Sequence, residues 1–467
     1  MKSPYKKSHK KSHKKSPPHK KSPHKKSSHK KSPPHKKSPH KKLSQMELLK
    51  LFKDRNINPH IGNIIKKKVS DDIFDKILSD IVYLNSPLIT EEKLRSRIEY
   101  DDHYDNYNAI KNLNFSGLNI ISLPKSIKNL TVTNNLDLSK NRLKRLPDEF
   151  YKIKVGGDLI LSNNSIESLP DSFVYIKVGG SLDLSHNHLR TLPDEFRNLE
   201  IGGNLDLSHN ILTLLSGFGK NLKIGGNLNL IRNELRSLPE SFGDIKIGGN
   251  LDLSYNQLRT LPEESFGDIK IGGNLSLSWN RLISLPENFG KIEIGGDLNL
   301  SNNELLSSLP ESFGRLKLGG DLNLYRDDLI KLPESFGNLE IGGDLDLSEN
   351  QLKSLPKNFG DIKIGGRLNL GDNKLKSLPE SFGNIKLKKG LNLSENKLGK
   401  LPESFGSLKI GGNLNLFRNE LTELPESFGN ITIGGDLYLS NNKLESLPKS
   451  FKNLEQKMEE QKCDIKM

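Results

Sequence analysis

The chain has 467 residues, with 71 Lys or Arg against 57 Asp or Glu, so its formal net charge is +14. Its single cysteine, Cys463, excludes a disulfide within the chain and the cysteine-rich caps typical of extracellular repeat proteins. The sequence has no apolar run near the ~18 residues of a membrane span and no secretory leader pattern. We therefore expect an intracellular protein of the cytoplasm or nucleus.

The first 42 residues repeat Lys, Ser, Pro and His, with 17 Lys and no acidic residue. Residues 43–467 hold 54 basic and 57 acidic residues, so the basicity belongs to this tail. With few apolar side chains to offset its ordering entropy, the tail is expected to be disordered. It either binds nucleic acid or another polyanion, or serves as a solubilising or nuclear-import segment. Five serines that precede proline are candidate phosphorylation sites: Ser3, Ser16, Ser22, Ser32 and Ser38.

Residues 43–110 lack the repeats that follow and predict a helical cap. Ser44 opens a capping-box pattern, Ser70 is expected to cap a second helix, and Thr90 is expected to start a third that runs through Leu94 and Ile98. We expect these helices to cover the exposed apolar end of the repeats. The segment from Val69 to Leu78 also resembles the opening of an F-box, a helical module that docks adaptors onto ubiquitin ligases. The Trp-containing later half of that module is absent.

Residues 111–451 repeat a unit of 23 residues, lengthened to 24 at Glu263-Glu264 and at Leu305-Leu306. A fixed period of this length predicts a solenoid. Fifteen units align on one position, which Leu118 and Asp327 occupy in two of them. In the others it is an asparagine: Asn141, Asn164, Asn187, Asn210, Asn233, Asn256, Asn280, Asn303, Asn350, Asn373, Asn396, Asn419 and Asn442.

The pattern L-x-L-x-x-N-x-L-x-x-L-P, as in Leu205 to Asn210, resembles intracellular leucine-rich repeat proteins. Proteins of this kind occur in amoebae and giant DNA viruses, and the Ala-poor, Lys- and Asn-rich composition is typical of A+T-rich genomes. The resemblance implies an α/β-type solenoid with a parallel β-sheet on its concave face. Glycine replaces the family's first leucine, as at Gly202. Leu199, Ile201 and Leu205 then predict a second extended segment before each main strand, and hence gentle curvature.

The asparagine position is predicted to be structural, because an amide both donates and accepts hydrogen bonds at the bend after the strand. Stacked copies would satisfy backbone groups of neighbouring coils. Asp327 cannot donate when ionised, and Leu118 can do neither. We expect these two coils to be the weak ones.

The residue before each asparagine varies along the chain, while the frame around it stays constant. Tyr255 and Trp279 occupy this position in consecutive units and should be neighbours, and exposed Tyr, Trp and Arg are typical of interface hot spots. An apolar residue followed by Arg recurs here every four units. The predicted partner-binding residues are Arg232, Tyr255, Trp279, Tyr325, Arg326, Phe417 and Arg418.

No set of nucleophile, base and acid converges, and the Gly-Gly pairs belong to the repeat, so we expect no catalysis, no cofactor and no metal. Residues 452–467 predict a short charged helix that caps the last coil. The sequence thus favours a non-enzymatic protein–protein interaction scaffold. Its alternatives are a nucleic-acid-associated protein that binds through residues 1–42 and an F-box-like ligase adaptor.

Overall fold

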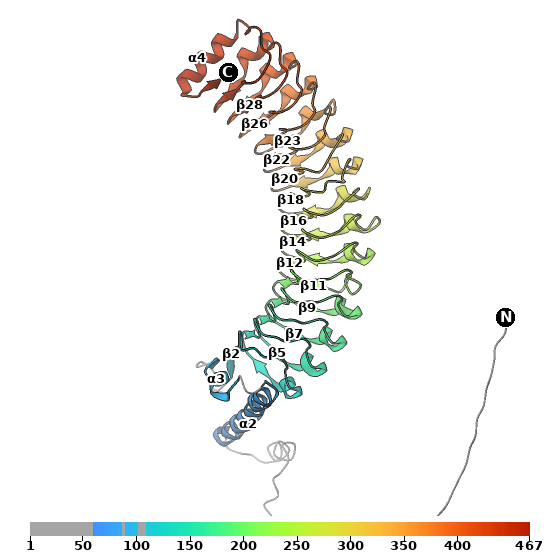
Figure 1. The fold of residues 1–467 in the computed structure, drawn as a ribbon, viewed down its shortest axis with the longest axis vertical. Coiled ribbons are helices and arrows are strands. Elements are labelled where there is room, and N and C mark those ends of the chain that lie inside the picture. Colours follow the sequence, from blue (N-terminus) through green and yellow to red (C-terminus); the bar gives the residue numbers. More distant parts are fainter. Residues whose placement is uncertain (1–58, 86–88, 101–108) are drawn as a thin grey trace, which may run out of the picture. The chain divides into compact units, whose positions relative to one another are not determined.

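The computed structural model describes residues 59–85, 89–100 and 109–467, with side chains from residue 71 onward. The chain divides into two units, Met1–Ile57 and Asn58–Met467, and the described residues all lie in the second. The predictions for the basic tail and for a helix at Ser44 lie outside the described residues. The second unit is a curved solenoid with a parallel sheet on its concave side (Figure 1), which confirms the predicted fold class.

Each coil carries a main strand whose leucine faces the core and whose next residue is partly exposed. Neighbouring main strands pair in parallel and in register, so that Leu228 lies opposite Leu251. These strands are β4 (Leu136–Asp137), β6 (Leu159–Ile160), β8 (Leu182–Asp183), β10 (Leu205–Asp206), β12 (Leu228–Asn229), β14 (Leu251–Asp252), β16 (Leu275–Ser276), β18 (Leu298–Asn299), β20 (Leu322–Asn323), β22 (Leu345–Asp346), β24 (Leu368–Asn369), β26 (Leu391–Asn392), β28 (Leu414–Asn415) and β30 (Leu437–Tyr438).

A second strand, also of two residues, precedes each of these main strands, as the alternation before the glycine pair predicts. These first strands also pair in register, in three separate runs that extend from β3 to β17, from β19 to β23 and from β25 to β29. They are β3 (Thr131–Val132), β5 (Lys154–Val155), β7 (Lys177–Val178), β9 (Glu200–Ile201), β11 (Lys223–Ile224), β13 (Lys246–Ile247), β15 (Lys270–Ile271), β17 (Glu293–Ile294), β19 (Lys317–Leu318), β21 (Glu340–Ile341), β23 (Lys363–Ile364), β25 (Lys386–Leu387), β27 (Lys409–Ile410) and β29 (Thr432–Ile433).

The glycine between the two strands is required by the close approach of adjacent coils. A Cβ atom on Gly225 would lie 2.2 Å from the carbonyl oxygen of Gly202 in the preceding coil. A larger residue here would force the two backbones apart. This contact explains why glycine replaces the usual leucine here. Two coils lack this glycine: Thr133 takes its place after β3, and Lys388 takes its place after β25, which does not pair with β23.

Short 3₁₀ helices form the convex side. They are η1 (Lys125–Asn129), η2 (Asp148–Lys152), η3 (Asp171–Tyr175), η4 (Asp194–Asn198), η5 (Glu240–Asp244), η6 (Phe266–Asp268), η7 (Phe289–Lys291), η8 (Glu311–Arg315), η9 (Glu334–Asn338), η10 (Phe359–Asp361), η11 (Glu380–Asn384), η12 (Glu403–Ser407) and η13 (Glu426–Asn430). From η2 onward each contributes a buried phenylalanine, and η1 contributes Ile127 in its place. From Phe196 to Phe451 these rings stack coil on coil, with centroids 5.7–6.5 Å apart.

At two places the sequence departs from the repeat, and in both the change affects only the nearby turn. Where Ser216 replaces the usual proline, a turn takes the place of the 3₁₀ helix, yet Phe218 still stacks on Phe196 at 5.7 Å. Where Leu305 is inserted, the amide of Leu306 donates to the carbonyl of Asn303 at 2.9 Å, and Leu305 projects into solvent. The interior therefore keeps its pattern at both sites.

The N-terminal cap differs in two respects from the sequence prediction: no helix begins at Ser70, and the third helical run, predicted through Ile98, ends at Arg95 because Ile98 lies in a strand. Helix α2 runs unbroken over Pro59–Asn85, so the expectation that a helix begins at Ser70 is wrong. Its residues Phe74, Ile77, Leu78 and Ile81 are buried in the solenoid core, which places the F-box-like segment in a capping role; the adaptor reading itself stays a prediction. Helix α3 (Glu91–Arg95) is capped by Thr90, whose Oγ1 accepts from Lys93 N at 3.2 Å.

Strands finish the sheet at both ends. Strand β1 (Ile98–Tyr100) pairs antiparallel with β2 (Ile110–Asn114), which begins the parallel series. At the C-terminal end, helix α4 covers Phe451–Gln461 and buries Leu454 and Met458. The last residues do not continue the helix but form β31 (Ile465–Lys466), which pairs with β30.

The aligned asparagines connect each coil to the preceding one. In the Asn256 coil, the side-chain Nδ2 donates to the carbonyls of Leu253 and Leu230, each at 3.0 Å. Its Oδ1 accepts from the amide of Leu235 at 3.1 Å. Its Nδ2 also lies 3.2 Å from the carbonyl of Ser254, so all four partners are backbone groups near the bend after the strand, two of them in the preceding coil. Such groups need partners when buried.

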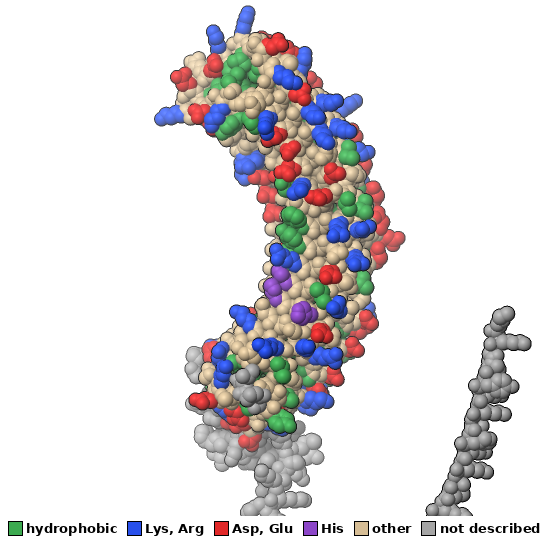
Figure 2. All heavy atoms as spheres, viewed as in Figure 1, with side chains coloured by type: hydrophobic (Ala, Val, Ile, Leu, Met, Phe, Trp, Pro, Cys, Tyr) green, Lys and Arg blue, Asp and Glu red, His purple; other side chains and the backbone are tan. Residues whose placement is uncertain are grey.

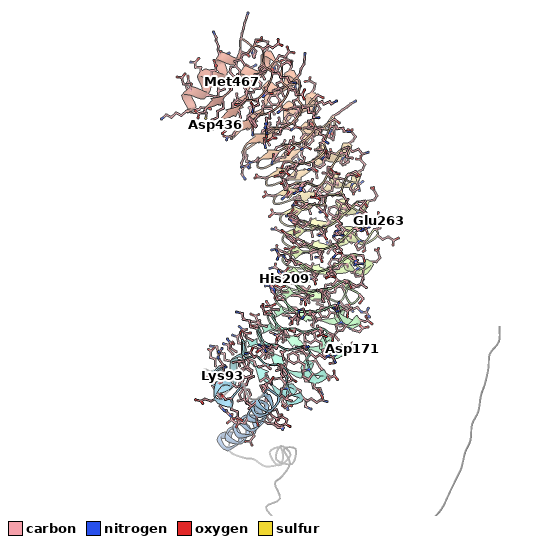
Figure 3. All side chains as sticks on the ribbon, viewed as in Figure 1. Lys93, Asp171, His209, Glu263, Asp436 and Met467 are labelled. Carbon is pink, nitrogen blue, oxygen red and sulfur yellow. The ribbon has the colours of Figure 1, made fainter. Side chains whose placement is uncertain are left out.

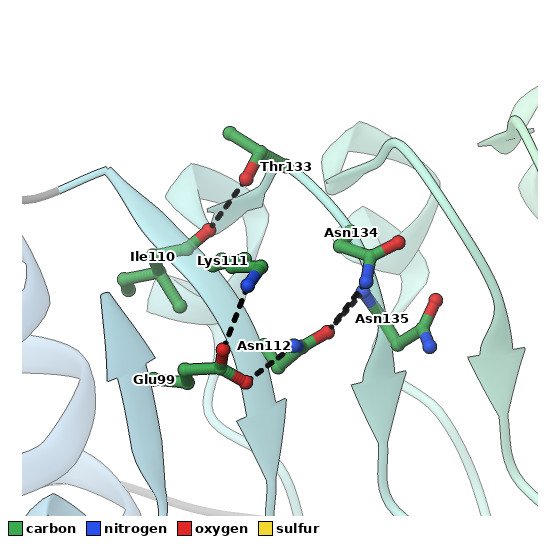
Figure 4. Close-up of polar contacts among 7 residues, drawn as sticks. All are labelled: Glu99, Ile110, Lys111, Asn112, Thr133, Asn134 and Asn135. Carbon is green, nitrogen blue, oxygen red and sulfur yellow. Dashed lines mark hydrogen bonds and ion pairs between the residues drawn. The ribbon is translucent and has the colours of Figure 1, made fainter. Parts of the chain in front are cut away.

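A second polar ladder, which the sequence reasoning missed, follows the glycine pair. The side-chain oxygen of one coil accepts the amide of the same position in the next coil, beginning with Asn112 Oδ1 and Asn135 N at 3.0 Å (Figure 4). It includes Asp297 and Asp321, whose carboxylates accept from Asp321 N and Asp344 N at 2.7 Å each. The stacked aspartates are therefore partners of backbone donors, which offsets their mutual repulsion.

Asp327 takes the place of an asparagine in the completely buried ladder position. Its Oδ1 accepts from the amide of Asn303 at 2.8 Å, while its Oδ2 is the only side-chain oxygen of the described ladder residues that is buried without a partner. Burial raises the pKa of Asp327 from 3.8 to about 8. The side chain is thus neutral at physiological pH.

We predict that Asp327→Asn stabilises the protein and removes a pH dependence. In the wild type the unfolded chain loses this proton near pH 4 and the folded chain near pH 8. The stabilisation that comes from this tighter proton binding is therefore complete below pH ~4. Above that pH the free energy of unfolding falls by ~1.4 kcal/mol per pH unit, up to pH ~8. Urea unfolding across this range measures the slope. Asp328→Asn, at the exposed neighbouring position, is the control. An unchanged slope in Asp327→Asn would contradict this assignment.

Candidate interaction surface

The turn at the end of each main strand places one residue in the left-handed region of the backbone. We call these residues the left-handed row. Their φ angles lie between 49° and 62°, and the row consists of Lys140, Asn163, His186, His209, Arg232, Tyr255, Trp279, Asn302, Arg326, Glu349, Asp372, Glu395, Arg418 and Asn441. It coincides with the variable position that the sequence singled out. Gly117 occupies the equivalent place in the first coil, with φ 69°.

The left-handed conformation is unfavourable for most of these residues. It costs an L-residue roughly 1–2 kcal/mol, and Gly, Asn and Asp adopt it most readily. The middle of the row nevertheless carries Arg232, Tyr255 and Trp279. Large side chains held against the local backbone preference are a recognised mark of functional surfaces.

Arg232, Tyr255 and Trp279 form one stack across three consecutive coils. The Tyr255 and Trp279 rings lie 5.3 Å apart at an interplanar angle of 8°, and the Arg232 guanidinium carbon lies 5.2 Å from the Tyr255 ring centroid. Tyr255 and Trp279 remain 41% and 46% exposed. The structure thus brings together the two aromatic residues that the sequence placed on adjacent coils, and their stacking limits the rotamer freedom that binding would otherwise remove.

Two histidines precede this stack along the row. The His186 and His209 rings stack at 4.0 Å, with His209 at the concave edge of the solenoid (Figure 3). Burial lowers the pKa of His209, and the nearby His186 and Arg232 lower it further. In Figure 2, histidine, basic and hydrophobic side chains follow one another along this edge. Among the described residues, no three His, Cys, Asp or Glu side chains are placed to hold a metal ion.

The other predicted pairs lie four and eight coils beyond Arg232 and make different contacts. The Tyr325 hydroxyl donates to Glu349 Oε1 at 2.7 Å, which raises the pKa of Tyr325. Arg326 pairs with Glu304 at 3.2 Å. These side chains are therefore engaged with acidic neighbours and do not join the aromatic stack.

The third pair repeats this arrangement. Arg418 lies over the Phe417 ring at 5.5 Å and pairs with Glu395 at 3.3 Å. At one strand spacing per coil, the three arginines of the row are ~19 Å apart. The predicted binding residues therefore form separate clusters on one continuous line.

Acidic residues occupy the row between the last two clusters. Glu349, Asp372 and Glu395 follow on successive coils. Partial burial raises the pKa of Asp372, and repulsion from Glu395 and Glu349 raises it further. The row thus changes from basic and aromatic to acidic along its length.

Four stretches of the chain, residues 181–199, 297–316, 389–408 and 436–454, match a family model described as Leucine Rich Repeat. Among solved structures, the chain is similar to a leucine-rich repeat protein from Leptospira interrogans, with 27% identity and a TM-score of 0.51 over 82% of this chain and 99% of that chain. It is also similar to the leucine-rich effector YopM from Yersinia pestis, with 23% identity and a TM-score of 0.47 over 87% and 99%. A search of curated proteins finds no match.

These findings identify the repeats as leucine-rich repeats arranged in the solenoid typical of such proteins. Solenoids of this class are typically protein–protein interaction scaffolds, and nothing in the described residues points to catalysis. None of the helices in the described part of the chain is both long and apolar enough to cross a membrane.

We predict that Asp372→Asn stabilises the protein by ~0.5 kcal/mol at neutral pH, because it removes like-charge repulsion from Glu349 and Glu395 on neighbouring strands. The raised pKa of Asp372 means that wild-type stability falls as pH rises through its titration. The difference between the two proteins should therefore vanish at low pH. Thermal unfolding at pH 3 and 7 measures it, with Asp361→Asn on the convex side as the control. Equal stability of Asp372→Asn and wild type at both pH values would contradict the repulsion.

Proposed function

We propose that the chain is a non-enzymatic scaffold that binds a partner protein along its concave, strand-end surface. The contact centres on Arg232, Tyr255 and Trp279, with Tyr325/Arg326 and Phe417/Arg418 as further contacts along the same line. The observation that carries this proposal is the exposed Arg–Tyr–Trp stack on a left-handed backbone. Stacked aromatic and Arg side chains at the centre of a polar surface are the usual anchors of protein interfaces.

The polar surroundings support the same proposal. Asn302 and the asparagines and aspartates of the main strands flank the aromatic stack, so a hydrophobic centre is surrounded by hydrogen-bonding groups. Interfaces commonly combine a buried apolar centre with a polar rim. The four-coil spacing of the three arginines favours a partner that is itself extended or repetitive.

We predict that the double variant Tyr255→Ala/Trp279→Ala loses the partner that the wild type captures in a quantitative pulldown. Loss of two hot-spot side chains should weaken binding by ~2 kcal/mol or more, about 30-fold. Tyr83→Ala, which removes an 85% exposed aromatic from helix α2, is the matched control and should bind normally. Capture of the same proteins by both variants would show that the stack is not the contact.

A second function rests on the basic tail. Seventeen Lys and no acidic residue in residues 1–42, joined to a remainder with slightly more acidic than basic residues, favour a separate polyanion-binding arm. We propose nucleic acid as its ligand, with phosphorylation of the Ser-Pro sites as the means of weakening it. The absence of paired cysteines supports an intracellular setting for either function.

We predict that deletion of residues 1–42 abolishes binding to an unrelated DNA duplex. Wild-type affinity should fall at least ~100-fold between ~50 and ~200 mM salt, because each neutralised phosphate releases a counterion. Fluorescence anisotropy with labelled duplex measures both effects. Tyr255→Ala/Trp279→Ala should bind DNA like the wild type. Retention of DNA binding by the deletion variant would assign that binding to the solenoid instead.

A further inference from the structure

A groove runs along the flank of the solenoid where the first strands lie, at the opposite end of the main strands from the left-handed row. It encloses about 1880 Å³ and extends from β3 to β19. Strand lysines line it: Lys154, Lys177, Lys223, Lys246, Lys270 and Lys317. Lys291 and Arg315 add charge from the 3₁₀ helices, and Glu200 and Glu293 are its only acidic lining residues among those described. We call this feature the lysine groove.

The repeat itself builds the groove. Each first strand alternates an exposed residue with a buried Val, Ile or Leu, so the lysines of successive coils all point outward. The floor consists of the first glycine of each pair, such as Gly225 and Gly248, which coil stacking requires to lack a side chain. The same glycines that allow the coils to pack therefore leave a hollow beside a row of cations.

Several of these lysines lie next to one another on neighbouring strands, where their positive charges repel. Lys154 lies opposite Lys177 in register, and Lys246 lies between Lys223 and Lys270. Like charges directly opposite each other on neighbouring strands are destabilising. Two of the lysines form ion pairs with glutamates: Lys223 Nζ lies 2.6 Å from Glu200 Oε1, and Lys270 Nζ lies 2.7 Å from Glu293 Oε1. Lys154, Lys177 and Lys246 form no salt bridge with any residue that the structure describes, although Lys177 lies near enough to Glu200 on the next strand to help lower the pKa of that carboxylate.

This concentration of cations is local. Residues 43–467 together hold 54 basic and 57 acidic residues, whereas the groove has eight basic and two acidic lining residues. A channel with one sign of charge and apolar walls raises the local concentration of oppositely charged ligands. The unpaired lysines are thus positioned for anions that come from outside the described chain.

We propose that the lysine groove binds an extended acidic segment of a partner protein. Nine first strands span ~38 Å at one strand spacing each, which matches about 12 residues of extended peptide. Carboxylates of such a segment would lie over Lys154, Lys177 and Lys246, and its uncharged residues would pass the sites held by Glu200 and Glu293. The site is separate from the concave surface and does not depend on the function proposed for it.

A protein segment fits the groove better than nucleic acid does. Tyr175 is the one aromatic among the described lining residues, so the groove offers no series of rings on which bases could stack. Glu200 and Glu293 would also repel a ligand with a charge on every unit. Discrete carboxylates separated by neutral residues avoid both problems.

Lysine footprinting of the full chain tests the proposal site by site. The probe is a peptide of about 12 residues that alternates Glu and Ser, and its Gln/Ser counterpart is the neutral control. Acetylation of each lysine is followed by mass spectrometry, so protection of the groove is measured separately from any protection of the tail. We expect Lys154, Lys177 and Lys246 to react at least threefold more slowly with the acidic peptide, while the exposed Lys374 and Lys376 are unaffected. Equal protection of the two sets would overturn the proposal.

Charge-matched variants provide the second measurement. Lys154→Gln/Lys177→Gln/Lys246→Gln should weaken binding of the acidic peptide three- to tenfold. Lys353→Gln/Lys374→Gln/Lys376→Gln removes the same charge outside the groove and should leave the groove lysines protected as in the wild type. Equal weakening by both variants would mean general attraction only and would contradict the site. Stronger protection of the groove by a single-stranded oligonucleotide of about 12 nucleotides than by the peptide would overturn the choice of ligand.

Discussion

The structure depends on contacts between adjacent coils, because each coil buries apolar side chains and pairs backbone groups of its neighbour. A unit of 23 residues is too small to bury its own leucines or to satisfy the backbone groups at its bends, so both needs are met only by stacking. Asn256 illustrates this, since two of its four backbone partners belong to the preceding coil. The stacked phenylalanines and the glycine contact between Gly202 and Gly225 impose the same spacing on the convex side and at the corner.

Because all coils share one interior, the residues that differ between repeats line up in rows on the surface. Equivalent residues of adjacent coils lie one strand spacing apart, so a single exposed side chain in one coil lies beside its equivalent in the next. The left-handed row gathers Arg232, Tyr255 and Trp279 into a stack, and the first strands gather lysines into a groove. The two features lie at opposite ends of the same main strands, which lets the scaffold contact partners on two sides through unrelated chemistry.

Two sequence irregularities weaken the contacts between coils at one place. Leu305 adds a residue beside Asn303, and the next ladder position holds the buried Asp327, whose proton is retained up to about pH 8. Both irregularities adjoin Tyr325 and Arg326 in the proposed binding line. The Oδ2 of Asp327 is buried without a partner, so we expect this coil to be less stable than its neighbours.

The sequence by itself determined the solenoid, the position of the strands and the adjacency of Tyr255 and Trp279. These follow from periodicity, since a constant step and strict alternation leave little freedom in which residues face inward. It did not determine that α2 continues through Ser70, because Ser70 lies inside a longer helix whose following residues Phe74 to Ile81 pack into the core. Only the tertiary structure decided the left-handed backbone of the variable row, the ladder after the glycine pair and the in-register lysines of the groove. The ladder and the lysine register arise from contacts between residues 23 or 24 positions apart, and the amides of the row donate to the next coil, as that of Trp279 does to the carbonyl of Ser301. No local pattern specifies this geometry.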